Sequence, residues 1–287
     1  MTPDALRQRL TGGPLLAVPG IQDMIAAVIA NKVGFEAVYG TGYWLTASAF
    51  GLPDAGIATY TQMLDRMATL ARTSEAAVIA DADTGYGGLL NVHHTVRGYE
   101  AAGIAAIQLE DQEFPKKCGH TPFKRLISKE DMVDKVRVAV AARRDMLIIA
   151  RTDARQSEGL DGAIARARAY ADAGADVLFV EALESEAEMR QACSVLDRPC
   201  MANMSNGGLT PMRTAAELAD IGYAMAIFPA LTSLAAASAI EVALRGLKEH
   251  GEGDPAGLFD FQEFCGLIGF EEVWAFENKW ARGDQRA

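Results

Sequence analysis

The sequence predicts an α/β fold, a (β/α)8 TIM barrel with a C-terminal helical extension. Short apolar runs alternate with longer segments of helical period, and eight strands and eight helices can be counted before residue 250. A second observation is the position of the glycines. Gly34, Gly103 and Gly174 each stand three residues before a predicted strand, 69 and 71 residues apart, which is close to two βα units. Gly222 has a similar place, and a left-handed glycine of this kind ends a helix.

The predicted strands are short and apolar, and the segments between them favour helix because they are rich in alanine and mostly free of proline. The strands cover residues 15–18, 37–39, 77–80, 106–109, 147–150, 177–180, 200–202 and 225–228. The clearest helical segments cover 91–102, 129–143, 160–173 and 212–221. This order places a catalytic barrel in residues 1–250. A linker rich in Gly, Asp and Pro follows at 251–257, so residues 251–287 form the extension.

The extension contains a tail at 259–281 that suggests two short amphipathic helices. Its apolar residues are Phe261, Phe264, Leu267, Ile268, Val273, Trp274, Phe276 and Trp280. A closed barrel leaves this aromatic surface no place in its own core. We therefore expect the tail to pack on another subunit, with capping of one barrel end as the alternative.

Composition and charge exclude several classes of protein. Apolar residues make up 50% of the chain and charged residues 23%, which excludes intrinsic disorder. The net charge of −11 and a pI near 4.9 oppose binding to nucleic acid or to anionic membranes. The uncharged segment 223–240 contains Pro229 and divides into a strand and a helix, so we expect no membrane span there. Four scattered cysteines and an N-terminus without an apolar leader favour the cytoplasm.

Polar and charged residues follow five consecutive predicted strands, at the end of the barrel where active sites of this fold lie. They are Asp81 and Asp83 after the third strand, Glu110 and Asp111 after the fourth, Arg151 and Asp153 after the fifth, Glu181 after the sixth, and Asn203 with Ser205 after the seventh. Such groups are costly to bury unless they face a polar centre. Five strands in succession are hard to explain as turn chemistry alone, so the sequence predicts a site here.

Three of these acids point to a metal. Asp81, Asp83 and Glu110 are oxygen donors without an accompanying His or Cys, and this donor set suits Mg²⁺, with Mn²⁺ as a possible substitute. The alternative is a ring of salt bridges in the barrel mouth, with Arg151 balancing the acids.

The segment FPKKCGH at residues 114–120 indicates a reactive thiol. Cys118 is flanked by Lys116, Lys117 and His120, and nearby positive charge favours the thiolate. The alternative is a buried structural cysteine, a description that suits Cys193 and Cys200 better because they lie in a predicted helix and strand.

Taken in order, these motifs resemble the isocitrate lyase/phosphoenolpyruvate mutase superfamily. The runs are DADTGY at 81–86, EDQ at 110–112, KKCGH at 116–120 and ARTD at 150–153, with GLPD at 51–54 as a further signature. The resemblance covers nearly the whole chain. It implies a barrel whose last helix is exchanged between subunits, in a homotetramer built as a dimer of dimers, with Mg²⁺ near Asp81, Asp83 and Glu110.

The resemblance also implies the substrate-binding residues. The loop of residues 39–43 would offer backbone N–H groups to a substrate carboxylate, and Asp54 would support the metal shell. The full set expected to bind substrate is Thr41, Gly42, Tyr43, Asp54, Arg151, Glu181, Asn203 and Ser205.

Within the superfamily the KKCGH loop is similar to that of the lyases, and the short chain looks like those acting on 2-methylisocitrate, 2,3-dimethylmalate or 2-alkylmalates. This implies an Mg-dependent carbon–carbon lyase that cleaves a 2-hydroxy di- or tricarboxylate by retro-aldol chemistry to a 2-oxo acid such as pyruvate. Asn206 stands where those lyases usually carry Glu, and Trp44 is bulkier than usual. The sequence therefore leaves the substrate open.

The expected catalytic residues are Cys118 as general acid, Lys116, His120 and Arg151 as sources of charge, and Tyr39. The initial base is open between Tyr39, Asp54 and a metal-bound water. Two rival functions keep the same fold. One is a carboxyphosphonoenolpyruvate-type phosphonomutase or an oxaloacetate hydrolase or decarboxylase, and the other is a non-catalytic oligomeric binding protein.

Overall fold

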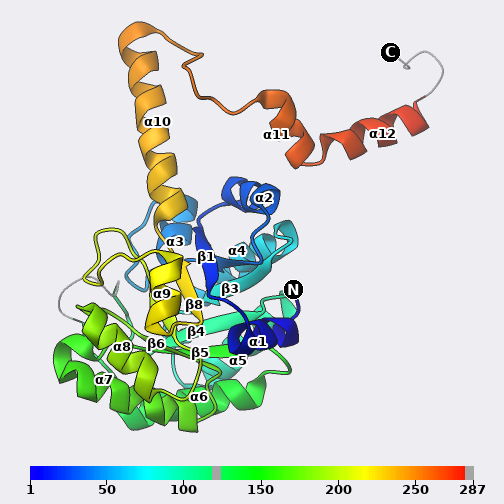
Figure 1. Ribbon diagram of the computed structural model, residues 1–287. Coiled ribbons are helices and arrows are strands. Elements are labelled where there is room, and N and C mark those ends of the chain that lie inside the picture. Colours follow the sequence, from blue (N-terminus) through cyan, green and yellow to red (C-terminus); the bar gives the residue numbers. More distant parts are fainter. Residues whose placement is uncertain (118–123, 282–287) are drawn as a thin grey trace. The chain divides into compact units, whose positions relative to one another are not determined.

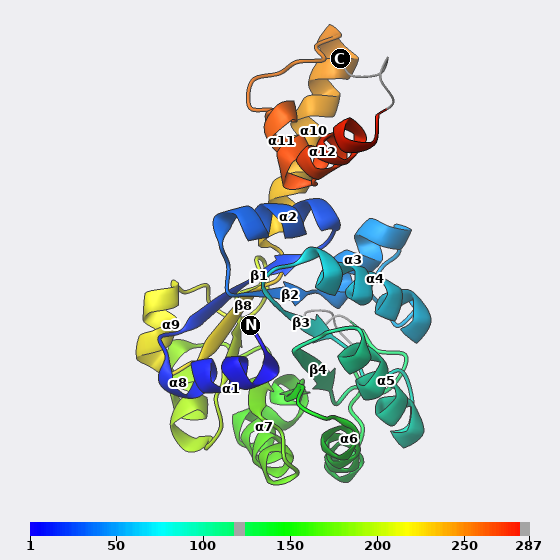
Figure 2. The ribbon, with the colours of Figure 1, turned by 90° about the vertical axis from the view of Figure 1, so that its right-hand side faces the viewer.

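The computed structural model describes residues 1–117 and 124–281 and contains the predicted barrel. Its eight strands are parallel and lie in the order β6-β5-β4-β3-β2-β1-β8-β7. The two ends of this order meet at a parallel bridge between Leu178 and Cys200, where the Leu178 N–H donates to the Pro199 carbonyl at 3.0 Å. The sheet is therefore closed, and Figure 2 shows its strands surrounded by helices.

All eight strands form where the sequence places them. They are β1 (Leu16–Ile21), β2 (Ala37–Gly40), β3 (Ala77–Asp81), β4 (Ala106–Glu110), β5 (Leu147–Thr152), β6 (Val177–Val180), β7 (Met201–Asn203) and β8 (Met225–Phe228). Several continue past their predicted ends to include a polar residue, as at Asp81, Glu110 and Asn203. These three side chains line a cavity at this end of the barrel, so the strands can include them without placing a polar group in apolar surroundings.

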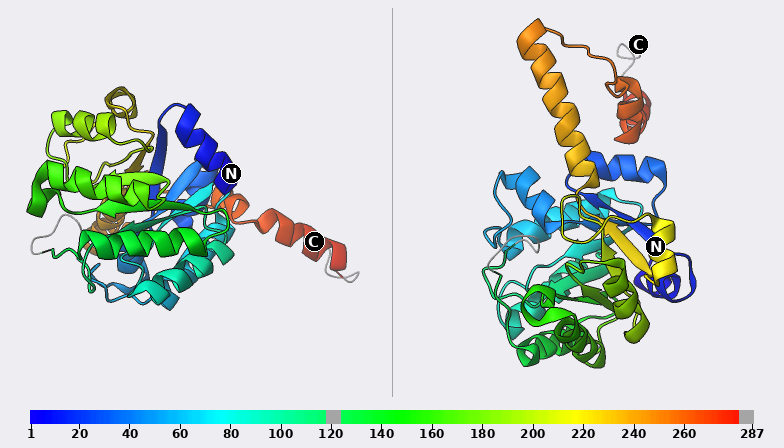
Figure 3. Two further views of the ribbon diagram at one scale, coloured as in Figure 1. Left: turned by 90° about the horizontal axis from the view of Figure 1, so that it is seen from below. Right: turned by 60° about the vertical axis from the view of Figure 1, so that its left-hand side comes forward.

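The barrel helices also match the alternating pattern, and Figure 3 shows them from two further directions. They are α2 (Met24–Val33), α3 (Gly42–Phe50), α4 (Tyr60–Thr73), α5 (Leu89–Ala101), α6 (Lys129–Ala142), α7 (Arg155–Asp172), α8 (Glu186–Val195) and α9 (Ala215–Ile221). A further helix, α10 (Leu231–His250), follows β8 in the chain, and Ser233 is its one buried residue. Gly34, Gly103, Gly174 and Gly222 have φ angles of 85°, 90°, 105° and 113° at helix C-termini. The predicted left-handed glycines are thus confirmed.

The core of the barrel has two layers. A larger apolar cluster fills the space between strands and helices, with residues such as Met67, Val96 and Tyr170. A second cluster fills the barrel interior, where Ile79 and Phe179 pack with Leu6 of α1 (Pro3–Gly12). Helix α1 therefore closes the end of the barrel where the strands begin, which leaves the opposite end for chemistry.

The chain divides into two compact units, Met1–Ser233 and Leu234–Ala287. The division falls within α10, before the linker at which the sequence places the boundary. The second unit contains α11 (Phe261–Leu267) and α12 (Phe270–Trp280), which match the two amphipathic helices expected in the tail. Its aromatic residues are largely exposed, with Phe261 73% and Trp280 65% exposed. Figure 1 labels both helices.

In the described part of the chain, no helix combines the length and the apolar character that crossing a bilayer requires. The uncharged segment 223–240 divides between β8 and α10, as expected.

Candidate active site

A cavity of about 300 Å³ opens at the carboxyl ends of the strands. Among its lining residues are Tyr39, Thr41, Tyr43, Trp44, Asp54, Asp81, Glu110, Lys116, Arg151, Glu181, Asn203, Ser205 and Asn206. Most of the predicted site residues thus meet in one place, and Gly42 and Asp83 contact this group directly. Cys118 and His120 lie outside the described residues.

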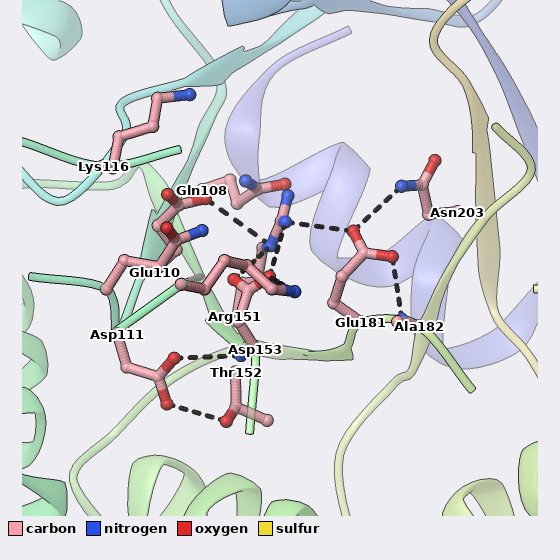
Figure 4. Close-up of polar contacts among 12 residues, drawn as sticks. Gln108, Glu110, Asp111, Lys116, Arg151, Thr152, Asp153, Glu181, Ala182 and Asn203 are labelled. Atoms are coloured by element: carbon pink, nitrogen blue, oxygen red, sulfur yellow. Dashed lines mark hydrogen bonds and ion pairs between the residues drawn. The ribbon is translucent and has the colours of Figure 1, made fainter. Parts of the chain in front are cut away.

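Arg151 is the centre of the charged cluster (Figure 4). Its Nε and Nη2 donate to the two carboxylate oxygens of Asp153 at 2.9 and 3.0 Å, and Nη2 lies 3.2 Å from Glu181 Oε2. Glu110 Oε2 lies 3.5 Å from Nε. Burial alone would lower the pKa of Arg151, but the Asp153, Glu181 and Glu110 carboxylates raise it well above its ordinary value. The guanidinium is therefore a permanent cation at the mouth.

Asp153 joins Arg151 to a second cation. Lys124 Nζ donates to Asp153 Oδ1 at 3.1 Å, and both side chains are buried. Burial alone would raise the pKa of Asp153, but the charges of Arg151 and Lys124 lower it to about 2. Beneath it, Asp111 accepts the Asp153 N–H at 2.9 Å and the Thr152 hydroxyl at 2.7 Å (Figure 4). These contacts fix the orientation of the guanidinium.

Lys116 occupies the other side of the site. Its ammonium lies 2.6 Å from Asp54 Oδ2 and 2.8 Å from Asp83 Oδ1. Burial alone would lower the pKa of Lys116, but Asp83, Glu110, Asp54 and Asp81 raise it well above its ordinary value. Lys116 is therefore a cation embedded among the acids, and it is unsuited to act as a neutral base.

The loop after β3 holds its carboxylates in a constrained conformation. Asp81 accepts the N–H groups of Gly42 at 3.3 Å and Asp83 at 3.0 Å. A Cβ at Gly42 would lie 2.8 Å from Asp81 Oδ2, so a side chain at this position would crowd the carboxylate. Asp83 itself has a φ of 49°, which is uncommon for a residue other than glycine. Strain of this kind is typical of functional sites.

The residues fit the divalent metal that the sequence predicts. Glu110 is 1% exposed, and its Oε1 has no hydrogen-bond partner among the residues that the structure describes, which is costly unless a ligand meets it. Asp81, Asp83 and Glu110 supply only hard oxygen donors. Over residues 1–117 and 124–281, however, no three acidic, His or Cys side chains are already arranged as a metal site. The ion pairs of Arg151 and Lys116 also match the alternative of a charged ring.

Tyr39 is held as a neutral phenol. Its hydroxyl donates to Gln108 Oε1 at 2.9 Å. Burial first, and then the charge of Asp81, raise the pKa of Tyr39 well above its ordinary value. A phenol in this state is a poor candidate for the initial base.

Two residues of the cluster, Gln108 and Lys124, are not among those predicted from the sequence. Gln108 lies two positions before Glu110 in β4, and this spacing places both on the same face of the strand. A polar residue in an apolar strand was the available signal. Lys124 had no such signal, because its partner Asp153 is 29 residues away in the sequence.

Comparison with known proteins places this site in a family context. A family model described as phosphoenolpyruvate phosphomutase matches residues 6–248. The chain is 42% identical to 2,3-dimethylmalate lyase of Eubacterium barkeri, over 97% of this chain and 98% of that protein. It is also 42% identical to 2-methylisocitrate lyase of Halalkalibacterium halodurans, over 97% of this chain and 93% of that protein.

The fold of this chain matches that of solved structures over nearly its whole length. Oxaloacetate acetylhydrolase in complex with 3,3-difluorooxalacetate matches with a TM-score of 0.91 and 35% identity, over 96% of both chains. Phosphonopyruvate hydrolase in complex with oxalate and Mg²⁺ matches with a TM-score of 0.88 and 30% identity, over 98% of this chain and 100% of that one. The superfamily resemblance expected from the motifs is confirmed.

Proposed function

Because this chain belongs to the phosphoenolpyruvate phosphomutase family, we propose that it is a carbon–carbon lyase that cleaves a 2-hydroxy carboxylate to a 2-oxo acid. Relatives at 42% identity over nearly the full length are named lyases. The observation that carries the proposal is the arrangement of the mouth. A permanent guanidinium, Arg151, shares one cavity with carboxylates on neighbouring strands, and this suits a reaction in which negative charge develops on a carbon.

The reaction breaks one carbon–carbon bond. The 2-hydroxyl loses its proton, its oxygen forms the carbonyl of the 2-oxo acid, and the electron pair of the C2–C3 bond passes to the other fragment. That fragment becomes an enolate-like carboxylate dianion, which then takes up a proton at C3. Arg151 can stabilise the dianion through Nη1, which makes no hydrogen bond to any residue that the structure describes.

The metal completes the proposed site. Bound Mg²⁺ would act as a Lewis acid that lowers the pKa of the substrate hydroxyl, and Asp81, Asp83 and Glu110 would hold it. Mn²⁺ would be a substitute. Asp54 would support this group, since Lys116 Nζ lies 2.6 Å from Asp54 and 2.8 Å from Asp83. The raised pKa of Tyr39, due to burial, leaves Asp54 or a water molecule as the better candidate for the initial base.

Substrate contacts and the final proton remain proposals from the sequence motifs. Thr41, Gly42 and Tyr43 would receive one substrate carboxylate at the start of α3, and Glu181, Asn203 and Ser205 would complete the pocket wall. Cys118 would protonate C3 as general acid, with His120 beside it in the KKCGH motif.

Oxaloacetate hydrolysis is a second candidate, because the structure of oxaloacetate acetylhydrolase matches with a TM-score of 0.91. One assay separates the two functions. The protein is incubated with Mg²⁺ and a panel of 2,3-dimethylmalate, 2-methylisocitrate, citramalate and oxaloacetate, and products are identified by NMR. A lyase releases pyruvate from at least one hydroxy acid. A hydrolase releases oxalate and acetate from oxaloacetate only, and this result would refute the lyase proposal.

We also propose a homotetramer in which the second unit packs between subunits. The exposed apolar residues of α12, among them Phe276 and Trp280, each 65% exposed, support this proposal because such surface is rarely left open to solvent. The four scattered cysteines suit a reducing compartment, and the cytoplasm is the proposed location. Sedimentation of the full chain tests the assembly.

A further inference from the structure

Helix α6 carries a lysine on its buried face. The buried residues of this helix are Met132, Lys135, Val136, Ala139 and Ala142, a spacing that places them on one side. Four of the five are apolar, but Lys135 is buried too, with 8% of its surface exposed. Burial lowers the pKa of Lys135, and the charges of Asp131 and Glu110 offset only part of this effect. A lysine in such a stripe is costly unless it has a specific partner.

That partner is the loop that follows β3. Lys135 Nζ donates to the Thr84 carbonyl at 2.9 Å, across 51 residues of sequence. Within residues 1–117 and 124–281, the Lys135 ammonium has no second hydrogen bond or ion pair. Thr84 is fully buried and directly follows Asp83, one of the acids proposed to hold the metal. The buried lysine of α6 is therefore committed to the backbone of the metal loop.

The backbone of this loop is in a conformation that must be held in place. Asp83 and Tyr86 have φ angles of 49° and 59°, and they are two of the three described non-glycine residues with a positive φ. Gly85, between them, has a φ of 83°. A positive φ is unfavourable for a residue with a side chain, and it persists only where the surrounding structure imposes it.

Three neighbouring elements hold the loop through its carbonyl groups. The carbonyls of residues 83, 84 and 85 accept, in order, from the Glu110 N–H of β4 at 3.0 Å, from Lys135 of α6 at 2.9 Å and from the Thr95 hydroxyl of α5 at 3.3 Å. Lys135 supplies the one charged donor of the three, and charge-assisted hydrogen bonds are the stronger kind. Its contact is thus the strongest of those that fix residues 83–85.

We propose that Lys135 is a positioning residue of the metal site. By holding the Thr84 carbonyl it keeps Asp83 in its left-handed conformation, with Asp83 Oδ1 2.8 Å from Lys116 Nζ at the cavity. Lys135 itself does not line this cavity. The inference rests on the proposed function, because it takes Asp83 as one of the residues that would hold Mg²⁺.

Position and charge predict opposite effects when Lys135 is removed. The charges of Lys135 and Glu110 are close enough to interact, so the ammonium on its own repels a cation held by Glu110. If Lys135 acted only through its charge, its loss would tighten Mg²⁺ binding. If it positions Asp83, its loss weakens Mg²⁺ binding, because the loop can then leave the conformation in which its carboxylate faces the site.

The test is Lys135→Met, which keeps the length of the side chain and removes the donor. Calorimetry of the metal-free protein with Mg²⁺ should show a Kd raised about tenfold. Hydrogen exchange followed by mass spectrometry should show amides of residues 82–85 exchanging about tenfold faster without metal. These amides include the Ala82 N–H, bonded to the Gln108 carbonyl at 3.0 Å, and the Gly85 N–H, bonded to the Ala82 carbonyl at 2.9 Å.

Three further variants complete the experiment. Lys135→Arg keeps a cationic donor and should restore both measurements toward wild type. Lys129→Met removes the same charge from the same helix at a half-exposed site, where the lysine pairs only with Glu130 at 3.7 Å, and should change neither. Lys135→Gln is neutral and shorter and should show the same two effects as Lys135→Met, so it replaces that variant if urea unfolding shows that the methionine is not tolerated.

The outcomes separate this inference from the proposed function. An unchanged or lower Kd in Lys135→Met, unchanged exchange in residues 82–85, or equal effects in Lys129→Met would each overturn the positioning role. If wild type binds Mg²⁺ but releases no pyruvate, the lyase function fails and the Kd values still decide the role of Lys135. If wild type binds no Mg²⁺, the proposed metal site fails, and the exchange rates decide whether Lys135 holds the loop.

Discussion

The Arg151–Asp153–Lys124 cluster allows a quantitative prediction of stability. Asp153→Asn keeps the shape of the side chain but replaces a buried carboxylate that accepts from Arg151 at 2.9 and 3.0 Å and from Lys124 at 3.1 Å. The NH2 group of the asparagine would face Arg151 or Lys124, and these are donors that cannot accept a hydrogen bond from it. Removing one partner of a buried ion pair costs about 3–5 kcal/mol. Arg151 retains Glu181 and Glu110, so we expect a loss of about 3 kcal/mol in the free energy of unfolding.

The depressed pKa of Asp153 gives a second figure that rests on the same charges of Arg151 and Lys124. This pKa lies at about 2, against about 3.9 in an unfolded chain, and this difference corresponds to about 2–3 kcal/mol at neutral pH.

Urea unfolding at pH 7 measures the free energy of unfolding of wild type and variant. The comparison requires that the m-value, the dependence of this free energy on urea concentration, is the same in both. Asp134→Asn is the control, because Asp134 forms an exposed ion pair with Arg137 at 3.3 Å and should cost less than about 0.5 kcal/mol. Equal losses in the two variants would refute the argument that burial makes the Asp153 pair important.

Three further predictions concern the pH dependence of stability, the binding of Mg²⁺ and the general acid of the reaction. The pKa of Asp153 is depressed on folding, so its contribution is present above about pH 4 and is lost as the pH falls toward about 2. The difference in the free energy of unfolding between wild type and Asp153→Asn should thus narrow between pH 4 and 3 in urea titrations. A difference that stays constant over this range would contradict the depressed pKa of Asp153. Glu110→Gln should weaken Mg²⁺ binding at least about tenfold by calorimetry, since a neutral amide replaces a carboxylate ligand; an unchanged Kd would exclude Glu110 as a ligand. Cys118→Ser should bind Mg²⁺ and succinate normally while pyruvate release falls by about 100-fold or more. Normal turnover in that variant would exclude Cys118 as the acid.

The architecture was predictable because each of its signals is local. An apolar run followed by a helical segment recurs around the whole barrel, with a left-handed glycine before every second strand, so strand number and order follow from the sequence. The ends of the strands were less predictable. The apolar runs predict that the third strand ends before Asp81 and the fourth before Glu110, whereas backbone pairing continues through both residues.

The members of the site could be predicted, but their pairing could not. Lys116 was expected beside a thiol, and the structure shows that its ammonium contacts Asp54, 62 residues away in the sequence. Which cation meets which acid depends on how separate loops converge over the barrel, and no local pattern encodes this. The division of the chain within α10, before the linker at 251–257, has the same origin. Helix α10 runs without interruption from Leu231 to His250, but residues up to Ser233 belong to the first compact unit and residues from Leu234 belong to the second.

The proposed lyase breaks a carbon–carbon bond and then protonates the carbon of the fragment that leaves. The most direct test is proton NMR of 2,3-dimethylmalate incubated with the protein and Mg²⁺ in D2O. Cleavage followed by protonation of C3 yields pyruvate and propionate in equal amounts, with one deuterium at C2 of each propionate molecule. The absence of both products, with the substrate intact and bound, would contradict the lyase function.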